Sequence, residues 1–376
     1  MKKGWQTKTL GDVCHVYQPA TISQKQMIAG EFRVYGANGQ IGWHNQFNHE
    51  EPELILGCRG SCGTVHVTEP QSWINGNAMV VHPTNGAMDI SFLAYALKGG
   101  IELTDAITGA AQPQITRTSL MPLVISFPES LAEQQRIVDL LDEAFEGLAT
   151  AKANAEQNLQ NARALFESHL QAVFSQRGEG WVETTVGAEI RFIDYRGKTP
   201  VKTEIGIRLI TAKNVKMGYL QESPMEYIAA DNYESWMTRG IPKKGDVLFT
   251  TEAPLANVAQ LDTDEKVAFA QRIIIMQPNA EKLDCTFLKY LLLSQPVQER
   301  IRSKGTGATV QGIKASLLKT IEISFPISLQ EQRRIVAQLD ALALETRSLA
   351  AIYERKLAAL EELKKSLLHQ AFSGEL

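Results

Sequence analysis

The stretch ISFPESLAEQQRIVDLLDE begins at Ile125, and a near copy of it, ISFPISLQEQRRIVAQLDA, begins at Ile323, 198 residues later. The same offset continues without a gap to the pair Phe174 and Phe372. It also extends upstream to the tripeptide TGA, which occurs at Thr108 and again at Thr306. Repeats of this length are domains with an attached helix rather than solenoid units, so the chain is a tandem duplication.

The two copies differ in length mainly at one place. Further upstream the offset falls to 195, then to 193, and near the front it is 176, as for Trp5 and Trp181. One insertion of about 17 residues between Asn214 and Asp246 accounts for most of that difference. The chain therefore divides into two diverged domains, residues 1–128 and 178–326, each followed by a closely similar segment, residues 129–177 and 327–376.

The two similar segments have the pattern of long helices. Apolar residues recur at alternating spacings of three and four, which is typical of a coiled coil, with a phase shift near Ala155 and Tyr353. Ser130 and Ser328 are followed three residues later by Glu133 and Glu331, the spacing of a helix-capping box. The alternative is a pair of ordinary amphipathic surface helices. The predicted seam consists of Ile137, Leu141, Leu148, Leu159, Phe166, Ile335, Leu339, Leu349, Tyr353 and Leu360.

We expect the two helices to lie antiparallel. The domain between them begins where one helix ends and finishes where the other starts. In each domain short apolar strands alternate with turns, and one helix follows, from Asp89 in the first domain and from Asp284 in the second. The predicted fold class is α+β, with two mixed α/β domains in tandem and two long helices related by a pseudo-two-fold axis.

Polar loops cluster between the predicted strands. The loops YGANGQIGWHN, GCRGSCG and GAAQPQITR in the first domain correspond to ITAKNVKMG, FTTEAPL and GATVQGIKA in the second. They contain the side chains that read base edges, because Asn and Gln suit adenine, Arg and Lys suit guanine, and Glu accepts from cytosine. Turns are polar in any protein, however, so this composition alone leaves the function open.

Composition excludes several classes. The chain has 376 residues, 44% of them apolar, and a net charge of −4. No segment is a basic tail, and even residues 179–326 carry 19 basic and 18 acidic side chains. We therefore expect any contact with nucleic acid to come from folded surfaces. No run of 18 apolar residues and no signal-peptide core occur, so we expect a cytoplasmic protein without a membrane span. Cys58 and Cys62, near three histidines, are only weak evidence for zinc.

The sequence contains no recognisable catalytic motif. No glycine-rich phosphate or dinucleotide loop follows a predicted strand, and the segment at Arg196 that contains Gly-Lys-Thr has Phe192 where a P-loop needs glycine. No segment with the Asn-Pro-Pro-aromatic pattern is present to hold a flipped adenine. We therefore expect no catalytic residues, no metal and no cofactor.

The duplicated frame, with FPESLAEQQRIV and FPISLQEQRRIV and the ending LKKSLLHQAFSGEL, resembles the specificity subunits of type I restriction–modification systems over essentially the whole chain. YGANGQIG, GDVLFTT and RGKTP resemble phrases of their target-recognition domains. The resemblance implies that each domain reads one half of a split double-stranded DNA site and that the helices act as a ruler. It also implies that two methyltransferase subunits dock to form an adenine-methylating enzyme, which restriction/translocase subunits can join.

Two other classes stay open: the recognition part of a different restriction–methylation enzyme, and a coiled-coil adaptor that does not bind DNA. The predicted DNA-binding residues are Asn38, His44, Arg59, Ser61, Gln114 and Arg117 in the first domain, and Arg196, Lys198, Lys213, Asn214, Thr250, Glu252, Gln271, Arg272, Lys304, Gln311 and Lys314 in the second.

Overall fold

The computed structural model describes the whole chain except residues 1–3, 85, 110–111, 177, 198 and 308–309. It forms two compact units, one made of Met1–Gln157 with Tyr353–Leu376 and the other of Asn158–Ile352. Each unit therefore combines one globular domain with parts of both long helices, α4 (Leu131–Ser175) and α10 (Leu329–Ser373). The predicted long helices are confirmed, and each is 45 residues long.

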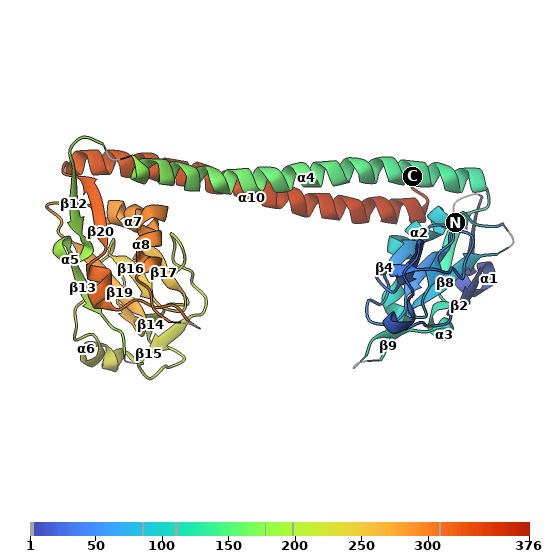
Figure 1. Ribbon diagram of the computed structural model, residues 1–376, viewed down its shortest axis with the longest axis horizontal. Helices are drawn as coiled ribbons and strands as arrows, with labels where there is room; N and C mark the ends of the chain where they lie inside the picture. Colours follow the sequence, from blue (N-terminus) through green and yellow to red (C-terminus); the bar gives the residue numbers. More distant parts are fainter. Residues whose placement is uncertain (1–3, 85, 110–111, 177, 198, 308–309) are drawn as a thin grey trace. The chain divides into compact units, whose positions relative to one another are not determined.

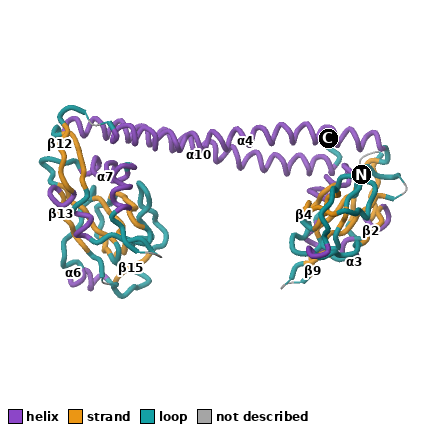
Figure 2. The backbone as a smooth tube through the Cα atoms, viewed as in Figure 1, coloured by secondary structure: helices purple, strands orange, loops and turns teal. Residues whose placement is uncertain are grey.

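The first globular domain is built on a four-stranded antiparallel sheet in the order β2-β8-β5-β6. Figures 1 and 2 show β2 in this domain. A three-stranded sheet β4-β3-β7 and the pairs β1-β11 and β9-β10 complete it. The strands are β1 (Trp5–Thr9), β2 (Cys14–Tyr17), β3 (Phe32–Gly36), β4 (Gly39–His44), β5 (Leu54–Gly57), β6 (Val65–Val67), β7 (Trp73–Ile74), β8 (Ala78–Pro83), β9 (Ile107–Thr108), β10 (Gln114–Ile115) and β11 (Val124–Pro128). The α-helices are α1 (Leu10–Val13), α2 (Ile90–Tyr95) and α3 (Arg117–Leu120).

The second globular domain repeats this topology. Its main sheet is β13-β19-β16-β17, beside the sheet β15-β14-β18 and the pair β12-β20. The strands are β12 (Trp181–Thr185), β13 (Ile190–Asp194), β14 (Ile207–Ile210), β15 (Glu226–Ile228), β16 (Val247–Thr251), β17 (Leu255–Gln260), β18 (Val267–Phe269), β19 (Ile273–Pro278) and β20 (Glu322–Pro326). The helices are α5 (Val186–Glu189), α6 (Tyr233–Trp236), α7 (Cys285–Leu293), α8 (Gln295–Ser303) and α9 (Ala315–Lys319). The mixed α/β tandem fold expected from the repeat is confirmed.

One helix prediction in the second domain is wrong in detail. The apolar segment that follows Asp284 forms two helices, α7 and α8, rather than one. Ser294, between them, has extended backbone angles, and Pro296 lies in the first turn of α8. Proline has no N–H for an interior helical hydrogen bond but is tolerated in a first turn, so it favours a new helix at this point.

The repeated motif anchors α4 to the first globular domain through one side chain. Gln134 is fully buried; its Oε1 accepts from the backbone N–H of Asp89 at 2.8 Å. Its Nε2 donates to the carbonyls of Ala87 at 3.0 Å and Pro128 at 2.8 Å. The side chain therefore satisfies three backbone groups at once and holds the start of α4 against the domain.

Gln332 makes the same anchor for α10 in the other unit. Its buried Oε1 accepts from the N–H of Asp284 at 2.8 Å, and its Nε2 donates to the carbonyls of Lys282 and Pro326 at 2.8 and 2.7 Å. The glutamine that both copies of the repeated motif contain is thus a structural anchor. Every partner in both anchors is a backbone group, so the anchors do not depend on which side chains the domains carry.

Within each unit the two long helices run antiparallel. In the first unit Arg136 of α4 donates to the carbonyl of Leu376 at 3.2 Å, and Lys152 pairs with Glu361 at 2.6 Å. A residue later in α4 therefore contacts a residue earlier in the C-terminal segment, as expected for antiparallel helices. In the second unit the end of α4, at Phe174, shares a core with the start of α10, including Leu339.

All but one of the residues predicted for the seam are buried or partly buried. Leu349 is 38% exposed, whereas its neighbour Ala350 is partly buried, so the prediction for Leu349 is wrong. The residues that face inward here are Thr346, Ala350 and Tyr353. The step from Thr346 to Ala350 is four residues, whereas we expected a step of three to Leu349, because the phase shift begins before Tyr353. Ile137, Leu141, Ile335 and Leu339 are buried, and Leu148, Leu159, Phe166, Tyr353 and Leu360 are partly buried.

Candidate nucleic-acid interface

The same backbone junction holds the polar loops together in both domains. In the first domain Cys58, just after β5, donates its N–H to the carbonyl of Asn77 at 3.1 Å and accepts from the N–H of Ile115 at 3.0 Å. In the second domain Thr251, at the end of β16, donates to the carbonyl of Arg272 at 2.8 Å and accepts from Ile313 at 2.9 Å. We call this arrangement the loop junction.

The loop junction brings most of the residues predicted in the first domain together. Arg59 forms an isolated antiparallel bridge with Gln114, and both residues are exposed. The Thr64 hydroxyl lies within hydrogen-bond distance of the carbonyl of Ser61, at 2.9 Å, and of the carbonyl of Ala37, next to exposed Asn38. The strand β9, which pairs with β10, lies at the end of this domain remote from α4 (Figure 1). The domain thus presents a polar surface at its free end.

The other two residues predicted in this domain differ in their exposure. His44 is 5% exposed; its Nδ1 lies 3.0 Å from the N–H of Ile28, and its ring packs against Trp73 with centroids 5.1 Å apart. The prediction that His44 contacts DNA is therefore wrong, because its ring is part of the domain interior. Arg117 is exposed at the start of α3, where its Nε lies 3.3 Å from the Met121 sulfur.

In the second domain the loop junction borders a pocket of about 470 Å³. The loops after β13, β16 and β18 and the segment before α9 form its walls. Residues predicted from the sequence account for much of the lining, and they carry both signs of charge. The predicted lining residues are Arg196, Glu252, Gln271, Arg272 and Lys314.

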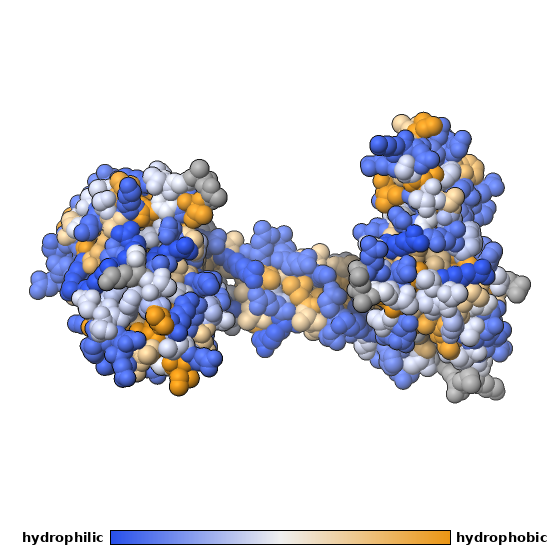
Figure 3. All heavy atoms as spheres, turned by 90° about the horizontal axis from the view of Figure 1, so that it is seen from below, coloured by the Kyte–Doolittle hydropathy of each residue, from blue (hydrophilic) through white to orange (hydrophobic). Residues whose placement is uncertain are grey.

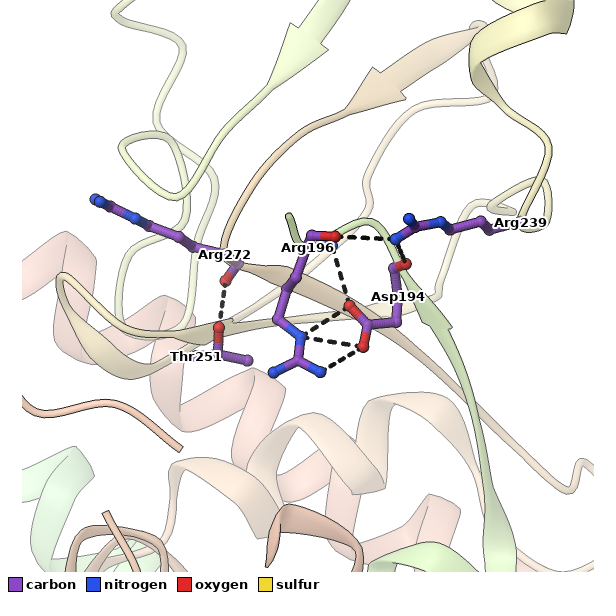
Figure 4. A network of polar contacts seen from close by, with 5 residues as sticks. All are labelled: Asp194, Arg196, Arg239, Thr251 and Arg272. Carbon is purple, nitrogen blue, oxygen red and sulfur yellow. Dashed lines mark hydrogen bonds and ion pairs between the residues drawn. The ribbon is translucent and has the colours of Figure 1, made fainter. Parts of the chain in front are cut away.

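A rigid ion pair forms one wall of this pocket (Figure 4). The Nε of Arg196 donates to Oδ1 of Asp194 at 2.8 Å, and its Nη2 donates to Oδ2 at 2.6 Å. Burial works to raise the pKa of Asp194, but the hydrogen bonds from Arg196 and the charges of Arg196 and Arg239 outweigh it, so the pKa lies below its ordinary value. Asp194 is therefore ionised at neutral pH and fixes the guanidinium of Arg196 in one orientation.

Arg239 supports this wall, and sequence reasoning missed it. Its Nη1 donates to the carbonyl of Asp194 and, at 3.0 Å, to the carbonyl of Arg196 (Figure 4). Arg239 belongs to the inserted segment, whose Trp236 also donates its indole N–H to the carbonyl of Phe269 at 2.9 Å. The inserted segment thus contacts, through Arg239, the backbone that carries Asp194 and Arg196. Since the first repeat has no equivalent segment, the comparison of the copies contained no signal for it.

Arg272 and Glu252 form a second, more exposed ion pair at the pocket. The Nε of Arg272 lies 3.1 Å from Oε1 of Glu252, and the two side chains are 46% and 48% exposed. Arg272 has a φ of +74°, in the left-handed region, and its carbonyl accepts a hydrogen bond from the N–H of Thr251. Figure 4 shows the Arg272 side chain extending away from the pair of Asp194 and Arg196.

Two polar residues predicted to contact DNA in this domain are buried instead. Asn214 is 1% exposed; its Oδ1 accepts from the N–H of Thr211 at 3.0 Å, and its Nδ2 donates to three carbonyls of the following turn. Thr250 is fully buried and donates its hydroxyl to the carbonyl of Pro254 at 2.6 Å. Both predictions are wrong, because these side chains satisfy backbone groups of tight turns.

Three other predicted residues lie outside the pocket lining. Lys304 donates its Nζ to the carbonyl and hydroxyl of Thr320 at 3.0 and 2.8 Å. Lys213 and Gln311 are exposed but do not line the pocket. Lys198 lies outside the described residues.

The described part of the chain contains no group of three or more His, Cys, Asp or Glu that could hold a metal ion. The thiols of Cys58 and Cys62 lie 3.1 and 3.0 Å from the carbonyls of Asn77 and Pro113.

No described helix has the length and apolar character needed to cross a membrane. The displayed face of each globular domain is mainly hydrophilic, with small apolar spots (Figure 3). The fold and this surface define a tandem two-domain protein with a polar, loop-built surface in each copy.

Comparison with known proteins identifies the class. The family model of the type I restriction modification DNA specificity domain matches residues 2–160 and 216–360. The specificity subunit of the type I restriction enzyme EcoBI from Escherichia coli is 22% identical over 352 residues, covering 86% of this chain and 73% of that protein. The MjaVIII specificity subunit from Methanocaldococcus jannaschii is 22% identical over 350 residues, covering 86% of this chain and 76% of that protein.

Solved structures show the same fold. A chain from a structural study of complex assembly and conformational transition of the type I R-M system superposes with a TM-score of 0.80 at 18% identity, covering 100% of this chain and 99% of that one. The HsdS subunit from Thermoanaerobacter tengcongensis gives a TM-score of 0.61 at 17% identity, with 100% and 98% covered. The chain belongs to the type I restriction modification DNA specificity family, and its role is DNA recognition as a specificity subunit.

Proposed function

We propose that each globular domain reads one half of a bipartite DNA site. One observation carries the proposal: the loop junction is the same in both copies, whereas the side chains that it presents differ. At corresponding positions the first domain has Arg59 and Asn77, and the second has Glu252 and Arg272. A common backbone frame with different donors and acceptors is suited to reading two different base sequences in one orientation.

We also propose a division of labour along the chain. Residues 1–128 and 178–326 act as target-recognition domains, and residues 129–177 and 327–376 act as the helices that set their spacing. The chain itself is not catalytic, since its sequence contains no recognisable catalytic motif. It works in the cytoplasm with two methyltransferase subunits, to which restriction/translocase subunits can be added.

The test uses the complete chain with and without its methyltransferase partner. We expect the chain alone neither to methylate nor to cut DNA, and the assembled complex to methylate adenine within a bipartite motif. Its DNA affinity should fall steeply as salt rises, because phosphate contacts release counterions. Methyl transfer by the isolated chain would contradict the non-catalytic role, and salt-independent binding would favour an adaptor that does not read DNA.

The spacing role has its own test. Seven residues, one heptad, are inserted into each long helix at facing positions beside the ion pair of Lys152 and Glu361, so that both helices lengthen together. Seven residues add about 10 Å of helix, so the unread gap should grow by up to roughly three base pairs. The half-sites themselves should stay the same. Changed half-site bases with an unchanged gap would show that the helices do not set the spacing.

A further inference from the structure

The ion pair of Arg272 and Glu252 leaves a defined set of polar atoms facing solvent. The pair uses the Nε of Arg272 and Oε1 of Glu252. Among the described residues, no hydrogen bond or ion pair occupies the two terminal nitrogens of Arg272 or Oε2 of Glu252. The Arg272–Glu252 pair therefore offers two adjacent donors followed by one acceptor.

This order matches one kind of base pair. In the major groove a G·C pair presents two acceptors on guanine, N7 and O6, followed by the amino donor of cytosine. An A·T pair presents an acceptor, a donor and an acceptor, so the adenine amino group would face a nitrogen donor of Arg272. We propose that Arg272 and Glu252 act as one unit that reads a G·C base pair, with Arg272 on guanine and Glu252 on the cytosine amino group. The inference rests on the proposed function, because it assumes that this domain reads DNA.

The surrounding structure holds the Arg272–Glu252 pair in place before DNA binds. Glu252 forms a backbone bridge with Gly312, where a side-chain Cβ would lie 3.2 Å from the Cβ of Glu252. The carbonyl of Arg272 accepts from the Thr251 N–H at 2.8 Å. Both reading residues are thus fixed to the same loop junction, which reduces the entropy that binding must remove.

The neighbouring arginine has a different role. Arg196 donates from its Nε and Nη2 to both carboxylate oxygens of Asp194, whereas Arg272 is paired with only one oxygen of Glu252. In the first domain the position of Glu252 is occupied by Arg59 and that of Arg272 by Asn77. The first domain has no carboxylate at either position, so the pair of opposite charges belongs to one half-site only.

The experiment is methylome sequencing of the assembled complex with two single variants. Arg272→Lys keeps the charge but removes the two-nitrogen fork, and Glu252→Ala removes the acceptor. Both should relax the same G·C position by roughly 10- to 100-fold, the range of one bidentate contact. The control is Glu234→Ala, which breaks the exposed ion pair with Lys266 in the same domain and should leave the motif unchanged.

Each outcome decides a different question. The inference is supported if both variants relax one shared G·C pair while the other half-site stays intact, which also shows that the variants fold and assemble. It is overturned if the affected pair is A·T, if the two variants relax different positions, or if neither changes the motif. Equal changes in both half-sites, or no sequence-specific methylation by the unaltered complex, would instead contradict the proposed function.

Discussion

The anchor residue Gln332 allows the sharpest test of how the domain is attached to its helix. Replacing Gln332 by Leu keeps a side chain of similar size but removes the partner of one backbone N–H and two carbonyls. A buried polar group left without a partner costs about 1–3 kcal/mol. Two of the three bonds are only partly buried, so water can reach part of the site. We therefore expect a loss of about 2–4 kcal/mol in the free energy of unfolding.

The measurement is thermal unfolding combined with amide hydrogen exchange. For a unit of this size each kcal/mol lowers the melting temperature by about 2–4 °C, so Gln332→Leu should lower it by roughly 4–16 °C. The matched control is Gln330→Leu, an exposed glutamine two residues earlier in α10, which should change stability by less than about 0.5 kcal/mol. The amide of Asp284 should lose protection only in the Gln332 variant, because that N–H donates to Gln332. Equal melting of both variants, with the Asp284 amide still protected, would refute the anchor.

Three further predictions concern single groups. Tyr290→Phe removes the 2.5 Å hydrogen bond to Asp340 and should destabilise its unit by about 1 kcal/mol in urea unfolding. Asp194→Asn should lose the fork with Arg196; because the pKa of Asp194 is lowered below its ordinary 3.8, the stability difference from wild type should be constant at neutral pH and disappear as the pH falls through the folded pKa. Gly307→Ala should cost more than about 1 kcal/mol by calorimetry, because φ is +119° and the new Cβ would lie 2.1 Å from a carbonyl oxygen.

The repeat made the architecture predictable. Two copies of a pattern with spacings of three and four over about 45 residues indicate helices, and only the local phase at Leu349 was wrong. Phase is difficult to assign where two four-residue steps follow each other, since either of two neighbouring residues can then face the partner helix. Most loops were also located correctly, because turn residues and strand periodicity bracket them. The prediction was wrong for YGANGQIGWHN, most of which forms strand β4 (Gly39–His44).

Individual loop residues were harder to assign. Asn214 and Thr250 have the donors and acceptors that suit base edges, but the same atoms suit the backbone groups of a tight turn. Sequence alone does not show which partner a side chain has. His44 is a similar case, since an imidazole can pack inside a domain as readily as it can face a ligand. Arg239 was missed for another reason: it acts from an insertion that the first copy lacks.

The location of the shared contacts explains why the helices stay alike while the domains diverge. Gln134 and Gln332 bind backbone groups of their domains, and the loop junction is likewise made from backbone hydrogen bonds. Backbone groups are present whatever the side chains are, so substitutions on the reading surface leave both attachments intact. The glutamine itself has no such freedom, because no other side chain offers an amide of that length with an acceptor and two donors. Selection for new DNA targets can therefore change Arg59 or Glu252, whereas the motif around each glutamine is kept in both copies.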